Sequence, residues 1–524
     1  MLQKIHTKPE GLFAWLDATL LALLTVLILS GITLVPFHGD EATYIHLSRD
    51  YDVIVKQGNL GAFLLNTNTD AGQGMRLSIG SILGFSIGFA RDVTGMGGSL
   101  NNNWDWGYTW SENIQQGNMP NRQLLTLARA CSALMGALSI VFFFLTTRQL
   151  LGSRPPAWVA AILLATHGGI LVHFRSAMQE GPKFLFLTVT LYLASRALKG
   201  LKNGRLHISI YVLLGLASGL TLAAKQDTVP MLLAIYLALA LVPVWQKETG
   251  QAILVNILYL GAATTLAFAS FLALMPIFWG WWETVFVLAG FATLLFQIPA
   301  WHVSKAAKPL ALAGCALIVG MTVVSPSLWY RIHIPFSKMM EVRRVIIGGQ
   351  VDYLMGNNLF YLNTIENKAR FLLTSIVTSS VTPSSMYMDP TSLGINPINE
   401  QIAIYETSYL DGRIDTPILD ALIVILFAVG IWALFRRFSM ESLLIFSLLF
   451  ITTAVLFASI PLPWQRYFLI LQIPYSLIAG VGAGEVWTWG TKFIEQPTRR
   501  KTKSKEPAPC SGAGSKLPTG AVPE

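Results

Sequence analysis

Long apolar segments recur along the whole chain and are separated mostly by short polar ones. Each is about 17 to 25 residues long, which is the length that a helix needs to cross a hydrocarbon core about 30 Å thick. A soluble domain could not bury so many such segments. The pattern predicts an all-α, polytopic membrane protein with about twelve transmembrane helices. The predicted spans are 12–36, 123–148, 156–174, 182–198, 208–224, 229–245, 252–276, 283–300, 309–325, 417–435, 441–460 and 467–486.

Two segments between the predicted spans, 37–122 and 326–416, are too long to be simple connectors. Leu77 to Ala90 in the first is apolar but short and glycine-rich, so we expect a helix in the membrane interface rather than a span. Met339 to Arg344 and Asn358 to Thr378 in the second are similar candidates. Because long ordered loops often carry function, both are candidates for part of a functional site.

Composition and charge support a membrane protein and indicate its orientation. Only 12% of the residues are charged, against about 25% in soluble proteins. The net charge of +9 comes mainly from basic residues in short loops and in the C-terminal tail. Since cytoplasmic loops are enriched in Lys and Arg, both termini are predicted to be cytoplasmic and both long loops extracytoplasmic, in a plasma membrane. The sequence shows no nucleic-acid motif, so membrane lipids are the expected surroundings.

The chain is expected to form one transmembrane domain, 12–486, followed by a basic, disordered cytoplasmic tail, 487–524. Three cysteines provide neither a disulfide framework nor a metal-ligand spacing. No metal site is predicted, no cofactor is required, and a divalent metal is possible only through carboxylates.

The first candidate for chemistry is His38-Gly39-Asp40-Glu41, directly after the first predicted span. Two adjacent carboxylates at the exit of a helix lie where a lipid headgroup would be, so Asp40 and Glu41 are candidate catalytic residues. The alternative is structural: Asp40 would cap a helix that begins at Glu41. The two interpretations are compatible, because a capped helix also holds a carboxylate in a fixed direction.

Three further polar turns fall on the same predicted side, at 175–183, 225–227 and 464–467. Each has a structural alternative: a short loop with Pro182 opening the next helix, a local ion pair, and interface anchors at the start of the last span. An arginine in the last turn could instead bind phosphate through its donor fork. The topology places all four features at one depth on one face. The candidate residues in these turns are Arg175, Glu180, Lys183, Lys225, Asp227, Arg466 and Tyr467.

These features together resemble a known family. They are the Asp-Glu pair after the first span, the charged turn that contains Glu180, the Gly-Leu-Thr-Leu-Ala-Ala-Lys turn at 219–225, and the Gln-Arg-Tyr-Phe-Leu-Ile-Leu-Gln-Ile-Pro segment at 465–474. The chain resembles the GT-C membrane glycosyltransferases over most of 12–486. The nearest branch contains the protein O-mannosyltransferases and the bacterial lipid A aminoarabinose transferases.

The resemblance implies a hexosyl or pentosyl transfer, with inversion, from a polyprenyl-phosphate sugar to an acceptor hydroxyl. The acceptor would be a lipid, a glycan or a protein. Asp40 would be the catalytic base, Glu180 stands at the second acidic position, and Arg466 stands where a basic residue precedes Tyr. Glu41 or Glu180 would orient the acceptor or stabilise positive charge on the sugar ring. The cations would stabilise the departing phosphate.

The chain departs from the family pattern in its first long loop. Many relatives carry a Lys-Pro-Pro turn whose Lys binds the lipid phosphate, whereas this chain has no Pro between Asp70 and Ile79 and offers Arg76 instead. An unusual insert at 101–110 contains Trp104, Trp106 and Trp110. Its aromatic rings could stack on a sugar or form an interfacial belt.

A transporter or flippase of a lipid or polar solute is the main alternative function. Transporters place charged residues near the bilayer midplane and use broken helices there. Here the candidate charges lie at the predicted outer boundary, which favours an enzyme. A non-catalytic component of a cell-envelope assembly is a further alternative, in which Asp40 and Glu41 would serve only as a helix cap.

Overall fold

The structure is a computed structural model that describes residues 9–59, 76, 79–299, 334–356, 362–377, 397–408, 410–411 and 417–503. All regular elements in these ranges are helices. By length and composition, eight of them could cross a membrane. These eight are α1 (Pro9–Ser30), α7 (Arg122–Leu151), α10 (Glu180–Lys202), α12 (Val229–Trp245), α13 (Gly250–Leu274), α20 (Pro417–Arg436), α21 (Met440–Ser459) and α23 (Gln472–Lys503).

The predicted all-α membrane fold is therefore confirmed, while the number of spans stays a prediction. Two shorter apolar helices, α11 (Ile208–Ala224) and α14 (Trp282–Gln297), coincide with predicted spans. The predicted span at 309–325 lies outside the described residues.

One predicted span is broken. The segment 156–174 forms α8 (Arg154–Thr166) and α9 (Gly168–Arg175), which meet at an angle of 60°. His167 between them has an extended backbone, and its ring nitrogen accepts from the amide of Ile170. Gly168 and Gly169 follow, and glycine is a poor helix former. The capped break therefore explains why one apolar segment yields two helices.

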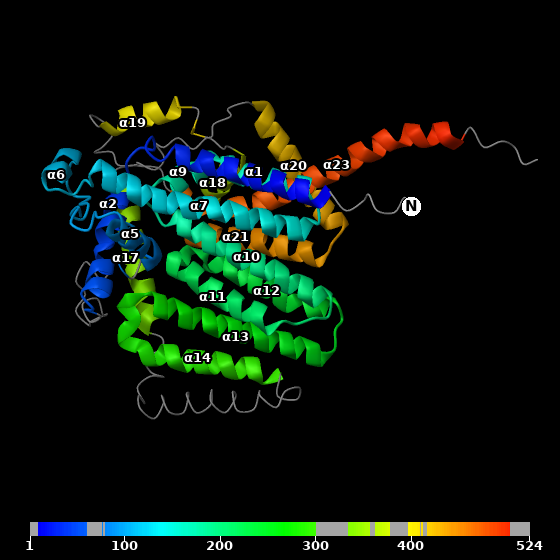
Figure 1. The fold of residues 1–524 in the computed structure, drawn as a ribbon, viewed down its shortest axis with the longest axis horizontal. Coiled ribbons are helices and arrows are strands. Elements are labelled where there is room, and N and C mark those ends of the chain that lie inside the picture. Colours follow the sequence, from blue (N-terminus) through cyan, green and yellow to red (C-terminus); the bar gives the residue numbers. More distant parts are fainter. Residues whose placement is uncertain are drawn as a thin grey trace, which may run out of the picture.

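The helices pack into an elongated bundle around α7 and α10 (Figure 1). Phe143, Phe144 and Leu187 lie in its core and are almost completely buried. Apolar side chains also cover the outer surface: Leu23 is 58% exposed and Ile418 is 83% exposed. Such large apolar areas would be unfavourable in water and are expected where a helix faces hydrocarbon.

The long loops supply short helices, and several of them gather at one end of the bundle, which we call the site end (Figure 1). The first loop contains α2 (Gly39–Leu47), α3 (Arg49–Tyr51), the π-helix η1 (Asp52–Lys56), α5 (Ser81–Val93) and α6 (Trp110–Gln115). The second loop contains α17 (Ile334–Gly356), α18 (Ile365–Val377) and α19 (Pro397–Glu406). Three short 3₁₀ segments and one short α-helix complete the described elements: η3 (Gln226–Thr228), η4 (Pro276–Trp281), η7 (Leu469–Leu471) and α22 (Gln465–Phe468).

The helix expected near Leu77 to Ala90 is α5, which has 13 residues and is shorter than the roughly 20 residues of a membrane span. Leu83 and Ile87 on α5 are completely buried. One face of this short helix thus packs against protein at the site end.

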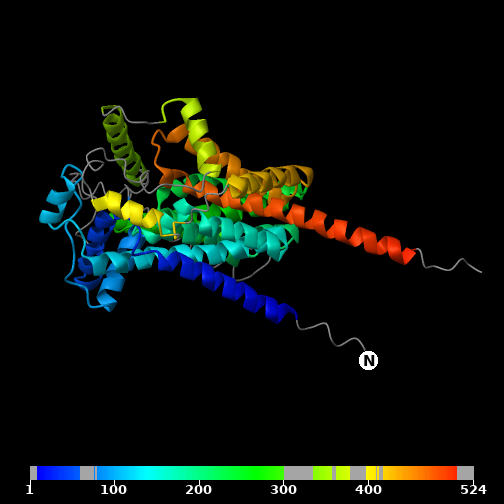
Figure 2. The same ribbon diagram turned by 90° about the horizontal axis from the view of Figure 1, so that it is seen from above.

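The start of α1 and the end of α23 lie at the end of the bundle opposite the site end (Figures 1 and 2). Helix α23 extends to Lys503, into the segment 487–524 that was predicted to be a disordered tail. The disorder of the tail stays a prediction. Residues 504–524 lie outside the described part of the chain.

Candidate active site

Asp40 and Glu41 lie in the first turn of helix α2, whose N-cap is His38 rather than Asp40. The His38 ring nitrogen Nδ1 accepts from the amide of Asp40 at 3.1 Å, and the Glu41 carboxylate accepts from the amide of His38 at 3.0 Å. This reciprocal capping box satisfies two amides that have no partner within the helix. The capping box does not use the side chain of Asp40, which lies in the first turn, where the helix dipole favours an acid.

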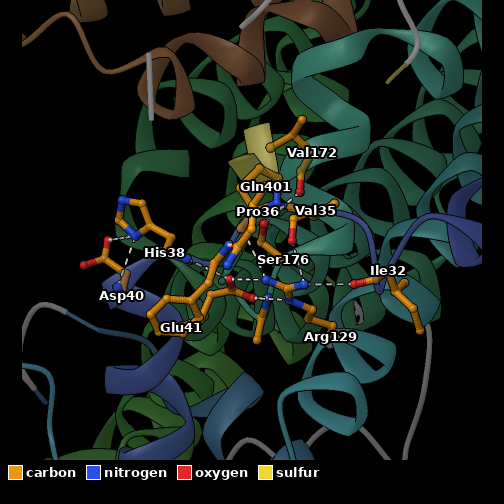
Figure 3. A network of polar contacts seen from close by, with 12 residues as sticks. Ile32, Val35, Pro36, His38, Asp40, Glu41, Arg129, Val172, Ser176 and Gln401 are labelled. Carbon is orange, nitrogen blue, oxygen red and sulfur yellow. Dashed lines mark hydrogen bonds and ion pairs between the residues drawn. The ribbon is translucent and has the colours of Figure 1, made fainter. Parts of the chain in front are cut away.

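Glu41 and Arg129 form a buried ion pair between α2 and α7 (Figure 3). Arg129 donates from Nε and Nη2 to the two carboxylate oxygens of Glu41, both at 2.8 Å. Its remaining donors bind the carbonyls of Ile32, Val35 and Pro36, in the segment between α1 and α2. Glu41 is completely buried. Its oxygens are occupied by protein donors, so this arrangement gives Glu41 a structural role.

Asp40 faces the opposite way from Glu41 and forms an ion pair with Arg466 of α22. The side chain of Asp40 is 23% exposed, whereas that of Glu41 is inaccessible. Burial would raise the pKa of Asp40, but the charges of Arg466, His38 and Lys225 outweigh it and lower the pKa below its ordinary value. Asp40 is thus an ionised and accessible carboxylate at neutral pH.

A second group of charges lies where α10 and η3 begin. Lys225 pairs with Glu180 and lies 3.5 Å from Asp227. Lys183 lies 3.3 Å from Asp227 and 3.7 Å from Glu180. All four side chains are at most 12% exposed. Two acids and two bases therefore form a nearly buried, electrically balanced cluster, which we call the lysine cluster.

Tyr467 connects the lysine cluster with the Asp40 pair. The Lys225 ammonium lies 5.7 Å from the centre of the Tyr467 ring, and the Arg466 guanidinium lies 5.6 Å from it. Such distances permit cation–π attraction. Six of the predicted site residues, together with the ring of Tyr467, thus form one charged site: Asp40, Glu180, Lys183, Lys225, Asp227 and Arg466.

Tyr44 and His173 belong to the same site and were not predicted. Tyr44 interacts electrostatically with Lys225, Asp40, Glu180 and Arg466, and burial raises its pKa, so its phenol stays protonated. It follows Asp40 by four residues on α2, a spacing that could have indicated a shared helix face. His173 of α9 interacts electrostatically with Glu180, Arg466 and Lys225. A single His in an apolar segment provides no comparable signal.

Arg175, predicted to bind substrate, is instead completely buried and bound by protein. Its guanidinium donates to the carbonyls of Leu27 and Ile28 at the end of α1, and to the Tyr405 hydroxyl and the Leu410 carbonyl. It thus attaches the second long loop to α1 and lies outside the charged site.

Arg76, the proposed substitute for the Lys of the family turn, also lies outside the charged site. It makes a two-pronged pair with Asp50 at 2.7 and 2.8 Å. It lines a small pocket that Tyr44 also lines.

The tryptophans of the insert at 101–110 pack together but differ in exposure: the ring centre of Trp104 lies 6.4 Å from that of Trp106 and 5.4 Å from that of Trp110. Trp104 is 6% exposed and packs against Phe37, with ring centres 5.3 Å apart. Trp106 is 55% exposed, with its ring centre 5.6 Å from that of His38. Trp104 therefore belongs to the local core, and Trp106 stays a candidate for a sugar platform or an interface anchor.

Among the described residues, no group of three His, Cys, Asp or Glu side chains is placed to hold a metal ion. The divalent metal that the sequence allows stays a prediction.

We predict that Glu41→Gln destabilises the protein by about 3–5 kcal/mol, because it leaves the Arg129 charge buried without its partner. The measurement is the thermal unfolding midpoint in detergent. Asp40→Asn is the matched control and should unfold close to wild type, since Asp40 is partly exposed. Glu41→Gln combined with Arg129→Met should recover part of the loss. Equal midpoints for Glu41→Gln and wild type would contradict the structural role of Glu41.

Comparison with protein families supports the predicted relationship over part of the chain. Residues 123–279 match the model of the dolichyl-phosphate-mannose-protein mannosyltransferase family. The matched segment contains Arg129 and the four residues of the lysine cluster, whereas Asp40 and Arg466 lie outside it. No curated protein matches the chain significantly.

Several solved structures are distantly similar. A Saccharomyces cerevisiae protein O-mannosyltransferase Pmt1–Pmt2 complex bound to the sugar donor shares 16% identity, with a TM-score of 0.37 over 54% of this chain and 35% of that one. An Archaeoglobus fulgidus oligosaccharyltransferase in complex with Zn and sulfate shares 12% identity, with a TM-score of 0.46 over 90% and 49%. ArnT from Cupriavidus metallidurans bound to undecaprenyl phosphate shares 12% identity, with a TM-score of 0.33 over 89% and 78%.

The chain spans only 35% and 49% of the first two of these structures. Its link to a family rests instead on the sequence match of its central segment. The resemblance predicted from the sequence is thereby confirmed for the central segment: residues 123–279 match the dolichyl-phosphate-mannose-protein mannosyltransferase family.

Proposed function

We propose that this protein transfers a sugar from a polyprenyl-phosphate donor to an acceptor hydroxyl, with inversion of the anomeric carbon. One observation carries the proposal: Asp40, the most exposed of the three carboxylates in the charged site, is paired with Arg466 beside the lysine cluster, at one end of a membrane helix bundle. The reaction needs a base beside cations, within reach of lipid substrates. The family match over 123–279 supports the same chemistry.

Asp40 acts as the general base in this proposal. Its carboxylate takes the proton of the acceptor hydroxyl while the acceptor oxygen attacks the anomeric carbon. The bond between this carbon and the phosphate oxygen breaks, and its electron pair stays on the phosphate. Because attack and departure occur on opposite faces of the carbon, a single displacement inverts its configuration.

The cations of the charged site stabilise the departing phosphate. Three acids (Asp40, Glu180 and Asp227) and three cations (Lys183, Lys225 and Arg466) balance to zero formal charge. As Asp40 becomes protonated, Arg466 loses its ionic partner at the moment when charge grows on the phosphate. Arg466 and Lys225 then stabilise the transition state more than the ground state. Glu180 and Asp227 hold the two lysines in place.

The proposal places the site on the extracytoplasmic face, with both termini in the cytoplasm. The distribution of Lys and Arg among the short loops supports this orientation. A lipid, a glycan or a protein serves as acceptor. Transport is less favoured, because the ion pairs of the charged site join the starts of α2, α10, η3 and α22 rather than the middles of spanning helices.

We predict that Asp40→Asn lowers turnover by roughly 10²-fold or more, because the amide cannot take the acceptor proton. The measurement is consumption of radiolabelled polyprenyl-phosphate sugars with envelope acceptor in liposomes. Asp92→Asn is the control, since Asp92 is 45% exposed and pairs only with Lys56 in the described contacts. Turnover by Asp40→Asn equal to that of the control would remove Asp40 from the mechanism.

We predict that Arg466→Gln moves the acidic limb of the pH–rate profile to higher pH. In wild type the lowered pKa keeps Asp40 ionised, so its protonation limits the rate only below the ordinary range of a carboxyl group. Arg466 is the largest of the charges that oppose the effect of burial, so without it the pKa of Asp40 rises and the base is lost at a higher pH. The measurement is kcat/KM between pH 4 and 8, a range set by the ordinary carboxyl pKa. The exposed Arg122→Gln serves as control, and an acidic limb that stays in place would refute the coupling.

A further inference from the structure

A narrow pocket opens beside the charged site, between α2, α5, the residue before α10 and η4. Its lining includes Tyr44, Gly84, Gln179, Pro276 and the Asp50–Arg76 ion pair. Its volume is about 30 Å³, roughly that of two water molecules, since a single water occupies about 10–15 Å³ on this measure. The pocket can therefore take a small group of two heavy atoms, but not a sugar ring.

Gln179, which lines this pocket, carries an unused hydrogen-bond acceptor. The side chain is 1% exposed, and its amide nitrogen donates to the carbonyl of Gly80 at 2.6 Å. That bond fixes the orientation of the amide. The other end, Oε1, is buried and has no hydrogen-bond partner. An unsatisfied buried acceptor is costly, so Gln179 is suited to a ligand that brings a donor.

The backbone at Gly80, whose carbonyl binds Gln179, is closely packed against the end of α11. A Cβ atom at Gly80 would lie 2.1 Å from the carbonyl oxygen of Ala223 and 2.2 Å from that of Ala224. These residues directly precede Lys225 of the lysine cluster. The contact joins the rim of the pocket to the charged site and holds the Gly80 carbonyl in place for Gln179.

Tyr44 shows how the pocket relates to the reaction. It lines the pocket and interacts electrostatically with Lys225, Asp40, Glu180 and Arg466 of the charged site. In the proposed reaction the sugar ring must lie between the acceptor, held by Asp40, and the phosphate, held by the cations. A group that projects from the ring past Tyr44 would enter the pocket.

We propose that this pocket binds the exocyclic hydroxymethyl group of the transferred sugar, whose hydroxyl donates to Oε1 of Gln179. The inference rests on the proposed glycosyl transfer and adds the class of sugar: a hexose rather than a pentose or a 6-deoxy sugar. A hydroxymethyl group has two heavy atoms, which matches the pocket volume. Pro276 and Ile277 provide an apolar wall for its carbon.

The test compares donors that differ only in this group. Wild type is assayed with a hexosyl polyprenyl phosphate, its 6-deoxy counterpart and the corresponding pentosyl donor, and kcat/KM is measured for each. We expect a preference for the hexosyl donor of about ten- to a hundred-fold, because the analogues leave the Gln179 acceptor unsatisfied. In Gln179→Met the ratio of hexosyl to 6-deoxyhexosyl kcat/KM should fall close to one.

The ratio of hexosyl to 6-deoxyhexosyl kcat/KM distinguishes a role of Gln179 in sugar recognition from a purely structural role. If Gln179 served only to hold Gly80, the variant would slow both donors equally and keep their ratio, and the inference would be overturned. Equal use of the donors by wild type, or faster use of the pentosyl donor, would also overturn it. If these donors are consumed without discrimination but Asp40→Asn is inactive, glycosyl transfer stands and the sugar assignment alone fails. No consumption of any donor by wild type would overturn both.

A second variant tests the size of the pocket without disturbing Gln179. In Gly84→Ala the added Cβ lies 3.5 Å from the Leu47 carbonyl oxygen, an ordinary contact, so the protein should fold. Gly84 and Leu47 both line the pocket, so the methyl group added at Gly84 narrows it. We expect a lower kcat/KM for the hexosyl donor and little change for the pentosyl donor. Gly261→Ala on α13, where the new Cβ also has room, is the matched control. Equal effects on both donors would contradict the subsite.

Discussion

The charged site depends on the buried ion pair between Glu41 and Arg129. Arg129 binds three carbonyls of the segment that leaves α1, in addition to both oxygens of Glu41. Glu41 also accepts from the amide of Ala177, at the turn before α10. One pair thus joins the exit of α1, the start of α2, the first half of α7 and the turn that leads to Glu180. A charge this deeply buried is stable only when all its partners are present, so the arrangement is rigid.

This rigidity gives the two neighbouring acids different tasks. Successive residues of a helix point about 100° apart, so Asp40 and Glu41 cannot face the same surroundings. Glu41 points into protein and is saturated with donors, whereas Asp40 points toward Arg466 and is partly accessible. The capping box fixes this division, because it uses the Glu41 side chain and the Asp40 amide together. The structural interpretation of the pair therefore applies to Glu41, and the catalytic interpretation applies to Asp40.

The second long loop is attached to the same region by two contacts. Gln401 of α19 accepts from the amide of Phe37, directly before the capping residue. Tyr405 and Leu410 accept from Arg175. The first contact lies beside the start of α2 and the second joins the ends of α1 and α9, so α19 lies close to Asp40. An arginine that appears from its position in a charged turn to be a substrate ligand is instead used to position a loop.

The sequence alone determined the fold class and the position of the polar turns. Hydrophobic segments of membrane length and the bias of basic residues are local properties, so they predict helices and bring Asp40, Glu180, Lys225 and Arg466 to one face. Only the tertiary structure decided which of these charges meet, because pairing depends on side-chain directions from helices that are far apart in the sequence. It excluded Arg175 and Arg76 from the charged site, assigned Glu41 to Arg129, and added Tyr44, His173 and the Gln179 pocket. Such contacts arise from helix packing and from one capped break at His167. Apart from the four-residue spacing of Asp40 and Tyr44, no local pattern of residues encodes them.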